Sequence, residues 1–190
     1  RQVLLPWLHL EQKREGSFRV AEAEQEHRLR LGELELSLRP DRVDQLADGR
    51  RLVIDYKTRA PSRGQWMGER PGEPQLPLYA LLDEKIQGIA FASIAEEPPQ
   101  FVGLGEALGL TSDNEKPLQQ QTKGIAEQWP ELIGAWRRSL TTLADDFISG
   151  EARVDPASGA CRYCDLASVC RVRQLQQDKR QRVGEVEDDV

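Results

Sequence analysis

The segment 42–57 constrains the fold of this chain more than any other. Two runs of strand-forming residues, Arg42–Leu46 and Arg51–Lys57, flank the tetrapeptide Ala47-Asp48-Gly49-Arg50. An Asp-Gly pair between such runs favours a tight hairpin turn that needs positive φ angles. The apolar run at 52–54 favours a central, buried strand. The sequence therefore predicts an antiparallel hairpin in the middle of a sheet.

The turn sets which side chains share a face of this hairpin. If Asp48 and Gly49 are the two loop residues, Ala47 pairs with Arg50 and Asp44 lies opposite Val53. Counting onward makes the residue at 55 the diagonal neighbour of position 44, on the same face. This register predicts a polar cluster on one side of the hairpin.

That cluster consists of Asp44, Asp55 and Lys57. Diagonal neighbours about 7–8 Å apart can bring two carboxylates to one hard divalent cation such as Mg²⁺ or Mn²⁺. A nearby lysine can orient a metal-bound water and stabilise the charge that develops at a phosphodiester. The alternative is an exposed salt-bridged stripe, which adds little stability. A carboxylate in a central strand is costly to bury without a metal or partner, which favours the metal site.

The remaining pattern alternates helices and strands, which indicates an α/β class. We expect a helix over 3–15, strands within 18–31 and 33–38, a loop over 58–74, a helix over 75–85 and a strand over 88–94. A turn-rich stretch, 96–117, precedes a helical pattern over 118–149 that is broken near Pro130. We expect a core domain over 1–150, a cysteine-bearing appendage over 151–178, and a charged, poorly ordered tail over 179–190.

Length and composition bound the class of protein. The 190 residues suit one domain with an appendage, and no apolar stretch is long enough to span a membrane. Three cysteines clustered between Cys161 and Cys170 are too few for a disulfide framework, which suggests a reducing, cytoplasmic compartment.

Net charge gives mixed evidence on nucleic-acid binding. The formal charge of −6 counts against a DNA binder, because cations placed against phosphates dominate DNA affinity. The segment 50–70, however, holds six basic residues against two acidic ones, although a solvated loop would look the same. DNA therefore stays a possible partner.

Three segments follow one another in order: Arg42-Val43-Asp44-Gln45-Leu46, Asp55-Tyr56-Lys57-Thr58 and Gln75-Leu76-Pro77-Leu78-Tyr79-Ala80. Their order and spacing resemble the PD-(D/E)XK nucleases of the RecB and AddB type. The resemblance implies a restriction-endonuclease-like core, with a mixed central β-sheet flanked by helices. It also implies a Mg²⁺- or Mn²⁺-dependent deoxyribonuclease, an exonuclease or end-processing enzyme of DNA repair or recombination.

The resemblance also implies residue roles. Asp44 and Asp55 would be metal ligands, the backbone carbonyl of Tyr56 would complete the site, and Lys57 would be the catalytic lysine. Gln75 and Tyr79, four residues apart on one helical face, would contact DNA or position the lysine.

Two further features of that family match less directly. Glu24 resembles the acidic residue on the preceding strand, although Glu22 and Glu26 share its face and an exposed acidic strand edge explains all three. RecB-type nucleases also carry an upstream metal-binding histidine, and neither His9 nor His27 lies in such a motif. We expect the chain to be part of a longer polypeptide.

Cys161, Cys164 and Cys170 follow the spacing C-x2-C-x5-C, which resembles part of the iron–sulfur motif of AddB-type nucleases. A 4Fe-4S cluster or a tetrahedral zinc site needs four ligands, so we expect the fourth cysteine to lie upstream in the full-length protein. The alternative is three buried or free thiols that pack the appendage against the core.

Two functions from different classes follow. The first is the metal-dependent nuclease, for which the resemblance implies a helicase domain or subunit as partner. The second is a DNA-binding or scaffolding module of a helicase-nuclease whose catalytic site is incomplete, consistent with the acidic charge and the missing histidine.

Overall fold

The computed structural model describes residues 3–106, 108–110, 116–157, 159–162, 164–170 and 172. The chain divides into two compact units, Arg1–Ser149 and Gly150–Val190. The predicted tail, 179–190, lies outside the described residues. The elements in chain order are α1 (Leu4–Gln12), β1 (Phe18–Ala23), β2 (His27–Leu31), β3 (Leu34–Leu38), β4 (Arg42–Leu46), β5 (Arg51–Lys57), the 3-10 helix η1 (Arg63–Trp66), α2 (Gln75–Ala80), β6 (Ile86–Ser93), β7 (Gln100–Gly105), α3 (Leu118–Gln121), α4 (Trp129–Ser149) and α5 (Ala167–Cys170).

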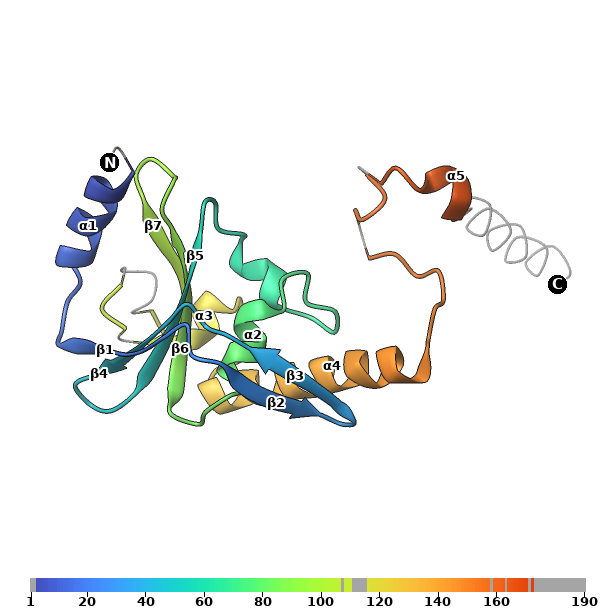
Figure 1. The fold of residues 1–190 in the computed structure, drawn as a ribbon, viewed down its shortest axis with the longest axis horizontal. Helices are drawn as coiled ribbons and strands as arrows, with labels where there is room; N and C mark the ends of the chain where they lie inside the picture. The colour runs from blue at the N-terminus through green and yellow to red at the C-terminus, as the bar shows by residue number, and fades with distance from the viewer. Residues whose placement is uncertain are drawn as a thin grey trace, which may run out of the picture. The chain divides into compact units, whose positions relative to one another are not determined.

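A five-stranded sheet forms the centre of the first unit (Figure 1). Its order is β1-β4-β5-β6-β7, in which β5 and β6 are parallel and the other neighbours are antiparallel. The connection from β5 to β6 runs through η1 and α2, as parallel neighbours require a crossover. The predicted α/β class, with a mixed sheet flanked by helices, is confirmed.

Helices cover both faces of this sheet, with α1 on one side and α2 and α4 on the other (Figure 1). On the α1 side, Trp7 is the buried residue of its helix and packs with Leu52, Ile54 and Phe101. On the other side, Val53 joins a cluster with residues from α2 and α4. The strand β5 is therefore buried on both faces, as its continuous apolar run predicts.

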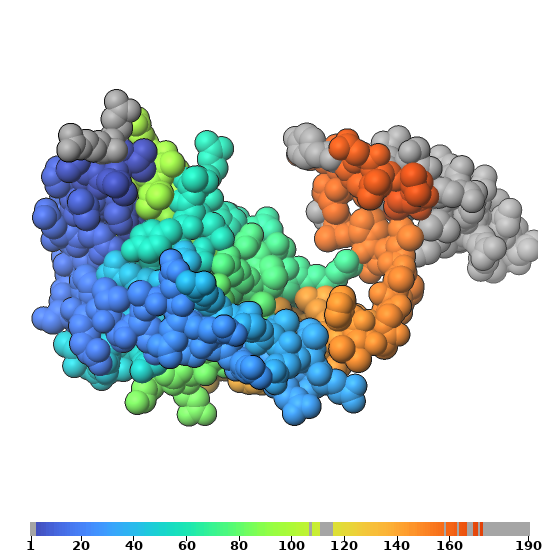
Figure 2. Space-filling model, viewed as in Figure 1, coloured from blue at the N-terminus to red at the C-terminus, as the bar shows by residue number. Residues whose placement is uncertain are grey.

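The helix α4 packs on the sheet through one apolar face. Its buried residues Leu132, Trp136, Leu140 and Ala144 recur every four positions, which places them on one helical face. Trp136 also donates its indole N–H to the Trp66 carbonyl at 2.7 Å. The hairpin of β2 and β3 lies against this helix and exposes its outer face to solvent (Figure 2).

Several predicted element boundaries were wrong. The expected turn-rich stretch contains β7. The helical pattern over 118–149 does break before Pro130, as predicted, but the break is wide and separates two helices, α3 and α4. The strand β7 was not predicted because its two glycines interrupt the pattern of strand-forming residues. A side chain at Gly105 would meet the Gln87 carbonyl at 2.8 Å, so close contact with β6 requires glycine there.

The hairpin register also differs from the prediction, by one residue. Leu46 and Arg50 pair, and the loop between them has three residues, ending at Gly49 with a φ of +88°. A three-residue loop with a left-handed glycine is the next most common hairpin after the two-residue turn. Asp44 consequently lies opposite Leu52, not Val53, which moves its side chain to the other face of the sheet.

Among the described residues, no helix has the length and apolar character needed to cross a membrane.

Candidate metal centre and active site

Four of the predicted site residues meet on the α2 side of the sheet. Lys57 at the end of β5 lies with its Nζ 3.0 Å from Asp55 Oδ2 and donates to Gln75 Oε1 at 2.6 Å. Gln75 in turn donates to Asp55 Oδ1 at 2.7 Å and to the Tyr79 hydroxyl oxygen at 3.0 Å. The first helical residue of α2 thus ties the carboxylate and the ammonium of β5 together.

Asp55 is the unusual member of this network, because its residue is only 2% exposed. Its Oδ2 is buried and, among the described residues, accepts no hydrogen bond of good geometry, although Lys57 Nζ is near. Burial raises the pKa of Asp55, and the charges of Asp41 and Glu73 raise it further, against the opposing effect of Lys57. A buried carboxylate is costly unless cations neutralise it, and Lys57 is one such cation while a bound metal ion would be another.

Asp41 is a site residue that the sequence analysis missed. It immediately precedes β4, where Arg42 pairs with Ile54, so continuing the register by one residue puts Asp41 opposite Asp55. Its Oδ2 accepts the backbone N–H of Tyr56 at 2.8 Å. The signal was present in the sequence, since counting the hairpin from a three-residue loop puts position 41 opposite position 55.

Asp44 lies on the other face of the sheet from this site. The prediction that Asp44, Asp55 and Lys57 cluster together was therefore wrong. Asp44 is fully buried on the α1 side, where Arg14 Nη1 donates to its Oδ2 at 2.6 Å. Arg42 donates to both of its oxygens, at 2.6 and 2.9 Å. The one-residue shift in register explains the difference, because it exchanges the two faces of the strand.

The Asp44 network holds α1 on the sheet. Arg42 also donates to Glu11 of α1 at 2.9 Å and to the Tyr56 hydroxyl at 3.1 Å. Burial opposes the charge of Arg42, but the hydrogen bonds to Asp44 and Tyr56 and the nearby carboxylates raise its pKa above the usual value. Arg14 lies over the Phe18 ring at 3.7 Å. These contacts make Asp44 a structural anion that is already neutralised by two guanidinium groups.

The residues on the α2 side fit a hard divalent cation. Asp41 and Asp55 offer carboxylate oxygens, and Mg²⁺ is commonly held by one or two carboxylates with water and substrate phosphate completing its shell. No group of three or more histidine, cysteine or acidic side chains in the described part of the chain has metal-binding geometry. Two carboxylates together with a backbone carbonyl are therefore the donor set that these residues offer.

Glu24, predicted as an acidic site residue, directs its carboxylate to Arg39 and not to Asp55. Its side chain is 65% exposed and pairs with Arg39, while Glu22 binds His27 and Arg51 at 2.8 and 3.0 Å. His9 is exposed on α1. Among the described contacts, none joins these groups to Asp55.

In the second unit, Cys161 and Cys164 are exposed and Cys170 is partly exposed, and all three thiols are free. Cys170 ends the short helix α5. Three thiols do not complete a four-thiolate site within the described residues. Free thiols are what the alternative of buried or free thiols allows, although Cys161 and Cys164 are exposed.

Asp55 yields a prediction about stability. Because burial raises its pKa, the folded metal-free chain binds this proton more tightly than the unfolded chain does. The stability of the metal-free chain therefore falls as the pH rises through the pKa that Asp55 has in the folded state. We expect Asp55→Asn to raise the melting temperature of the metal-free chain at neutral pH, by about 2–4 °C per kcal/mol of relieved cost. Calorimetry at neutral and acidic pH tests this, and an equal gain at both pH values would contradict it.

Comparison with known proteins identifies the family to which this chain belongs. The model of the PD-(D/E)XK nuclease superfamily matches residues 1–171. A solved structure, the crystal structure of SSO0001, is similar at 18% identity with a TM-score of 0.41, covering 87% of this chain and 67% of that one. No curated protein matches. Since the family model spans most of its length, this chain belongs to the PD-(D/E)XK nuclease superfamily, whose members are generally nucleases that use divalent metals.

Proposed function

We propose that this chain is a divalent-metal-dependent nuclease that hydrolyses phosphodiesters in DNA. Asp41 and Asp55 hold the metal, and Lys57 is the catalytic lysine. The observation that carries the proposal is Asp55 Oδ2, which is buried without a good hydrogen bond and lies 3.0 Å from Lys57 Nζ. Family membership supports the same reaction class.

When bound, Mg²⁺ or Mn²⁺ polarises a phosphoryl oxygen and lowers the pKa of a coordinated water. The chain itself supplies position and charge. Lys57 is one-third exposed, so its ammonium can reach substrate from a place fixed by Gln75 and Asp55. There it orients the attacking water and stabilises the negative charge that develops on the phosphate. The backbone carbonyl of Tyr56 is the third proposed metal ligand.

Gln75 and Tyr79 keep this lysine in place. Gln75 uses its carbonyl for Lys57 and its amide N–H groups for Asp55 and Tyr79, so one side chain satisfies three partners. Tyr79 donates its hydroxyl hydrogen to the Arg39 carbonyl at 3.1 Å. We assign Gln75 and Tyr79 as positioning residues for the lysine and Asp55.

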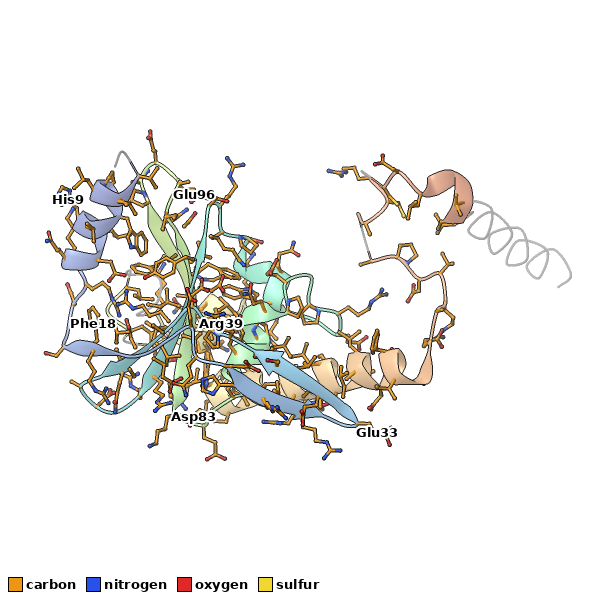
Figure 3. The ribbon with its side chains drawn as sticks, in the orientation of Figure 1. His9, Phe18, Glu33, Arg39, Asp83 and Glu96 are labelled. Atoms are coloured by element: carbon orange, nitrogen blue, oxygen red, sulfur yellow. The ribbon has the colours of Figure 1, made fainter. Side chains whose placement is uncertain are left out.

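An open cleft of about 700 Å³ begins at Thr58, the residue after Lys57. Thr58 and Arg59 line one part of it, and the segment that contains Glu96 lines another. Glu96 is labelled in Figure 3. This cleft supports a path for the substrate strand past the end of β5. Because its lining mixes basic and acidic groups, affinity along this path depends on local contacts and not on net charge.

The finer assignments rest on the resemblance to RecB- and AddB-type enzymes. They are exonuclease or end-processing activity in repair or recombination, a helicase domain or subunit as partner, and a 4Fe-4S cluster that takes its fourth cysteine from elsewhere. End-labelled linear DNA and closed circular DNA, compared as substrates, distinguish an exonuclease from an endonuclease.

Lys57→Met tests the catalytic assignment. We expect cleavage of end-labelled DNA in Mn²⁺ to fall by about 10²–10⁴-fold, because a positioned proton-transfer or charge-stabilising group contributes about that much. Mn²⁺ binding, measured by calorimetry, should persist, since both carboxylates remain. Unchanged cleavage by a purified, folded Lys57→Met variant would contradict the role of this lysine.

The second candidate is a DNA-binding module without catalysis. It is favoured by the absence, among the described residues, of a third acidic or histidine side chain that completes the metal group. This module predicts salt-sensitive DNA binding by the wild type with no metal-dependent cleavage.

A further inference from the structure

The tripeptide Arg39-Pro40-Asp41 joins β3 to β4 and carries the proposed metal ligand. We infer that Glu24, together with Arg39, is a positioning residue that fixes Asp41 for metal binding. In this role Glu24 acts through its contacts with Asp41 and Arg39 and is not itself a metal ligand. The functional part of this inference rests on the proposed nuclease function.

Glu24 contacts both ends of the tripeptide. Its backbone N–H donates to the Asp41 carbonyl at 3.1 Å, and its own carbonyl accepts Arg39 Nε at 2.9 Å. Arg39 Nη2 also donates to Glu24 Oε2. One residue after β1 thus binds the loop through its main chain and its side chain.

The backbone of Glu24 is unusual for a residue with a side chain. Its φ is +48°, in the left-handed region that L-residues other than glycine rarely adopt. In this conformation both its N–H and its carbonyl bond to the tripeptide. A strained residue whose two main-chain groups bind one short loop indicates that the loop position matters.

Two contacts from the active site hold the same tripeptide. Tyr79 donates to the Arg39 carbonyl at 3.1 Å, and Tyr56 N–H donates to Asp41 Oδ2 at 2.8 Å. Figure 3 shows Arg39 in the central region, beside α2. The main chain of Asp41 is therefore held by Glu24, which Arg39 binds, and the carboxylate of Asp41 is held by the Tyr56 amide.

The Arg39–Glu24 ion pair is exposed, so its effect on the position of the loop can be distinguished from an effect on the stability of the fold. The side chains of Arg39 and Glu24 are 63% and 65% exposed, and ion pairs this exposed contribute little to the free energy of unfolding. Loss of the pair therefore loosens the loop without unfolding the chain. The expected consequence is local, at Asp41 and at the amide that it binds.

Arg39→Met tests the inference, with Arg28→Met as matched control. Arg28 also forms an exposed ion pair, with Glu35 at 3.0 Å on the β2–β3 hairpin. In Arg39→Met we expect faster hydrogen exchange of the Tyr56 amide and a Kd for Mn²⁺ about tenfold weaker, as is typical when a supporting residue of a metal ligand is lost. Arg39→Lys should recover part of both effects. Arg28→Met should change neither, and both methionine variants should keep the wild-type melting temperature within a few degrees.

Unchanged Tyr56 exchange and unchanged Mn²⁺ affinity in Arg39→Met would overturn the inference. The same changes in Arg28→Met would overturn it too, because they would show a general effect of lost surface charge. If wild-type chain binds no Mn²⁺, the proposed function fails. The exchange rate of the Tyr56 amide, which needs no metal, then decides by itself whether Arg39 positions Asp41.

Discussion

Asp41→Asn should abolish metal-dependent DNA cleavage while leaving the fold intact. The proposed centre has two acidic side chains, so loss of one charge removes half of the anionic ligand set. An asparagine oxygen can still accept the Tyr56 N–H that Asp41 accepts at 2.8 Å, which preserves the loop. We expect cleavage at background level and no measurable Mn²⁺ binding, by digestion of end-labelled DNA and by calorimetry.

A melting temperature close to that of the wild type is the required control for Asp41→Asn. Retained cleavage and retained Mn²⁺ affinity in this folded variant would show that Asp41 is not a ligand.

Asp44→Asn should instead destabilise the chain. Asp44 is fully buried and bonds Arg14 and Arg42, so its neutralisation leaves guanidinium charge in a dry site. Removing one partner of a buried ion pair costs about 3–5 kcal/mol. For a chain of this size, each kcal/mol lowers the melting temperature by about 2–4 °C. Thermal unfolding measures the effect directly.

A double variant, Asp44→Leu with Arg14→Met, provides the control for this interpretation. Replacing buried charges together by apolar side chains is often close to neutral, so the double variant should be more stable than Asp44→Asn. If Asp44→Asn melts like the wild type but loses Mn²⁺ binding, Asp44 is a ligand after all and the register of the hairpin is wrong.

The sequence predicted the extent of the hairpin but not its faces. Both strands were located at the correct residues, because alternation and the Asp-Gly pair are local signals. The register was not determined locally, since Ala47-Asp48-Gly49 is compatible with loops of two or three residues. A slip of one residue exchanges every side chain between faces, so Asp44 was predicted opposite Val53, on the face of Asp55, where Val43 lies instead.

Other parts of the site depend on contacts distant in sequence. Gln75 lies 20 residues from Asp55, and Arg14 lies 30 residues from Asp44. Periodicity within one element does not specify which elements meet. The Gln75–Tyr79 pair could be predicted because its partners share one helical face, whereas the neutralisation of Asp44 by Arg14 could not.

The most direct test of the proposed centre is anomalous diffraction from crystals of the chain soaked in Mn²⁺. We expect one strong anomalous peak bound by the carboxylate oxygens of Asp41 and Asp55, at about the 2.0–2.2 Å typical of small divalent cations with oxygen ligands. A peak at Asp44, or no peak beside well-ordered Asp41 and Asp55 side chains, would contradict the account.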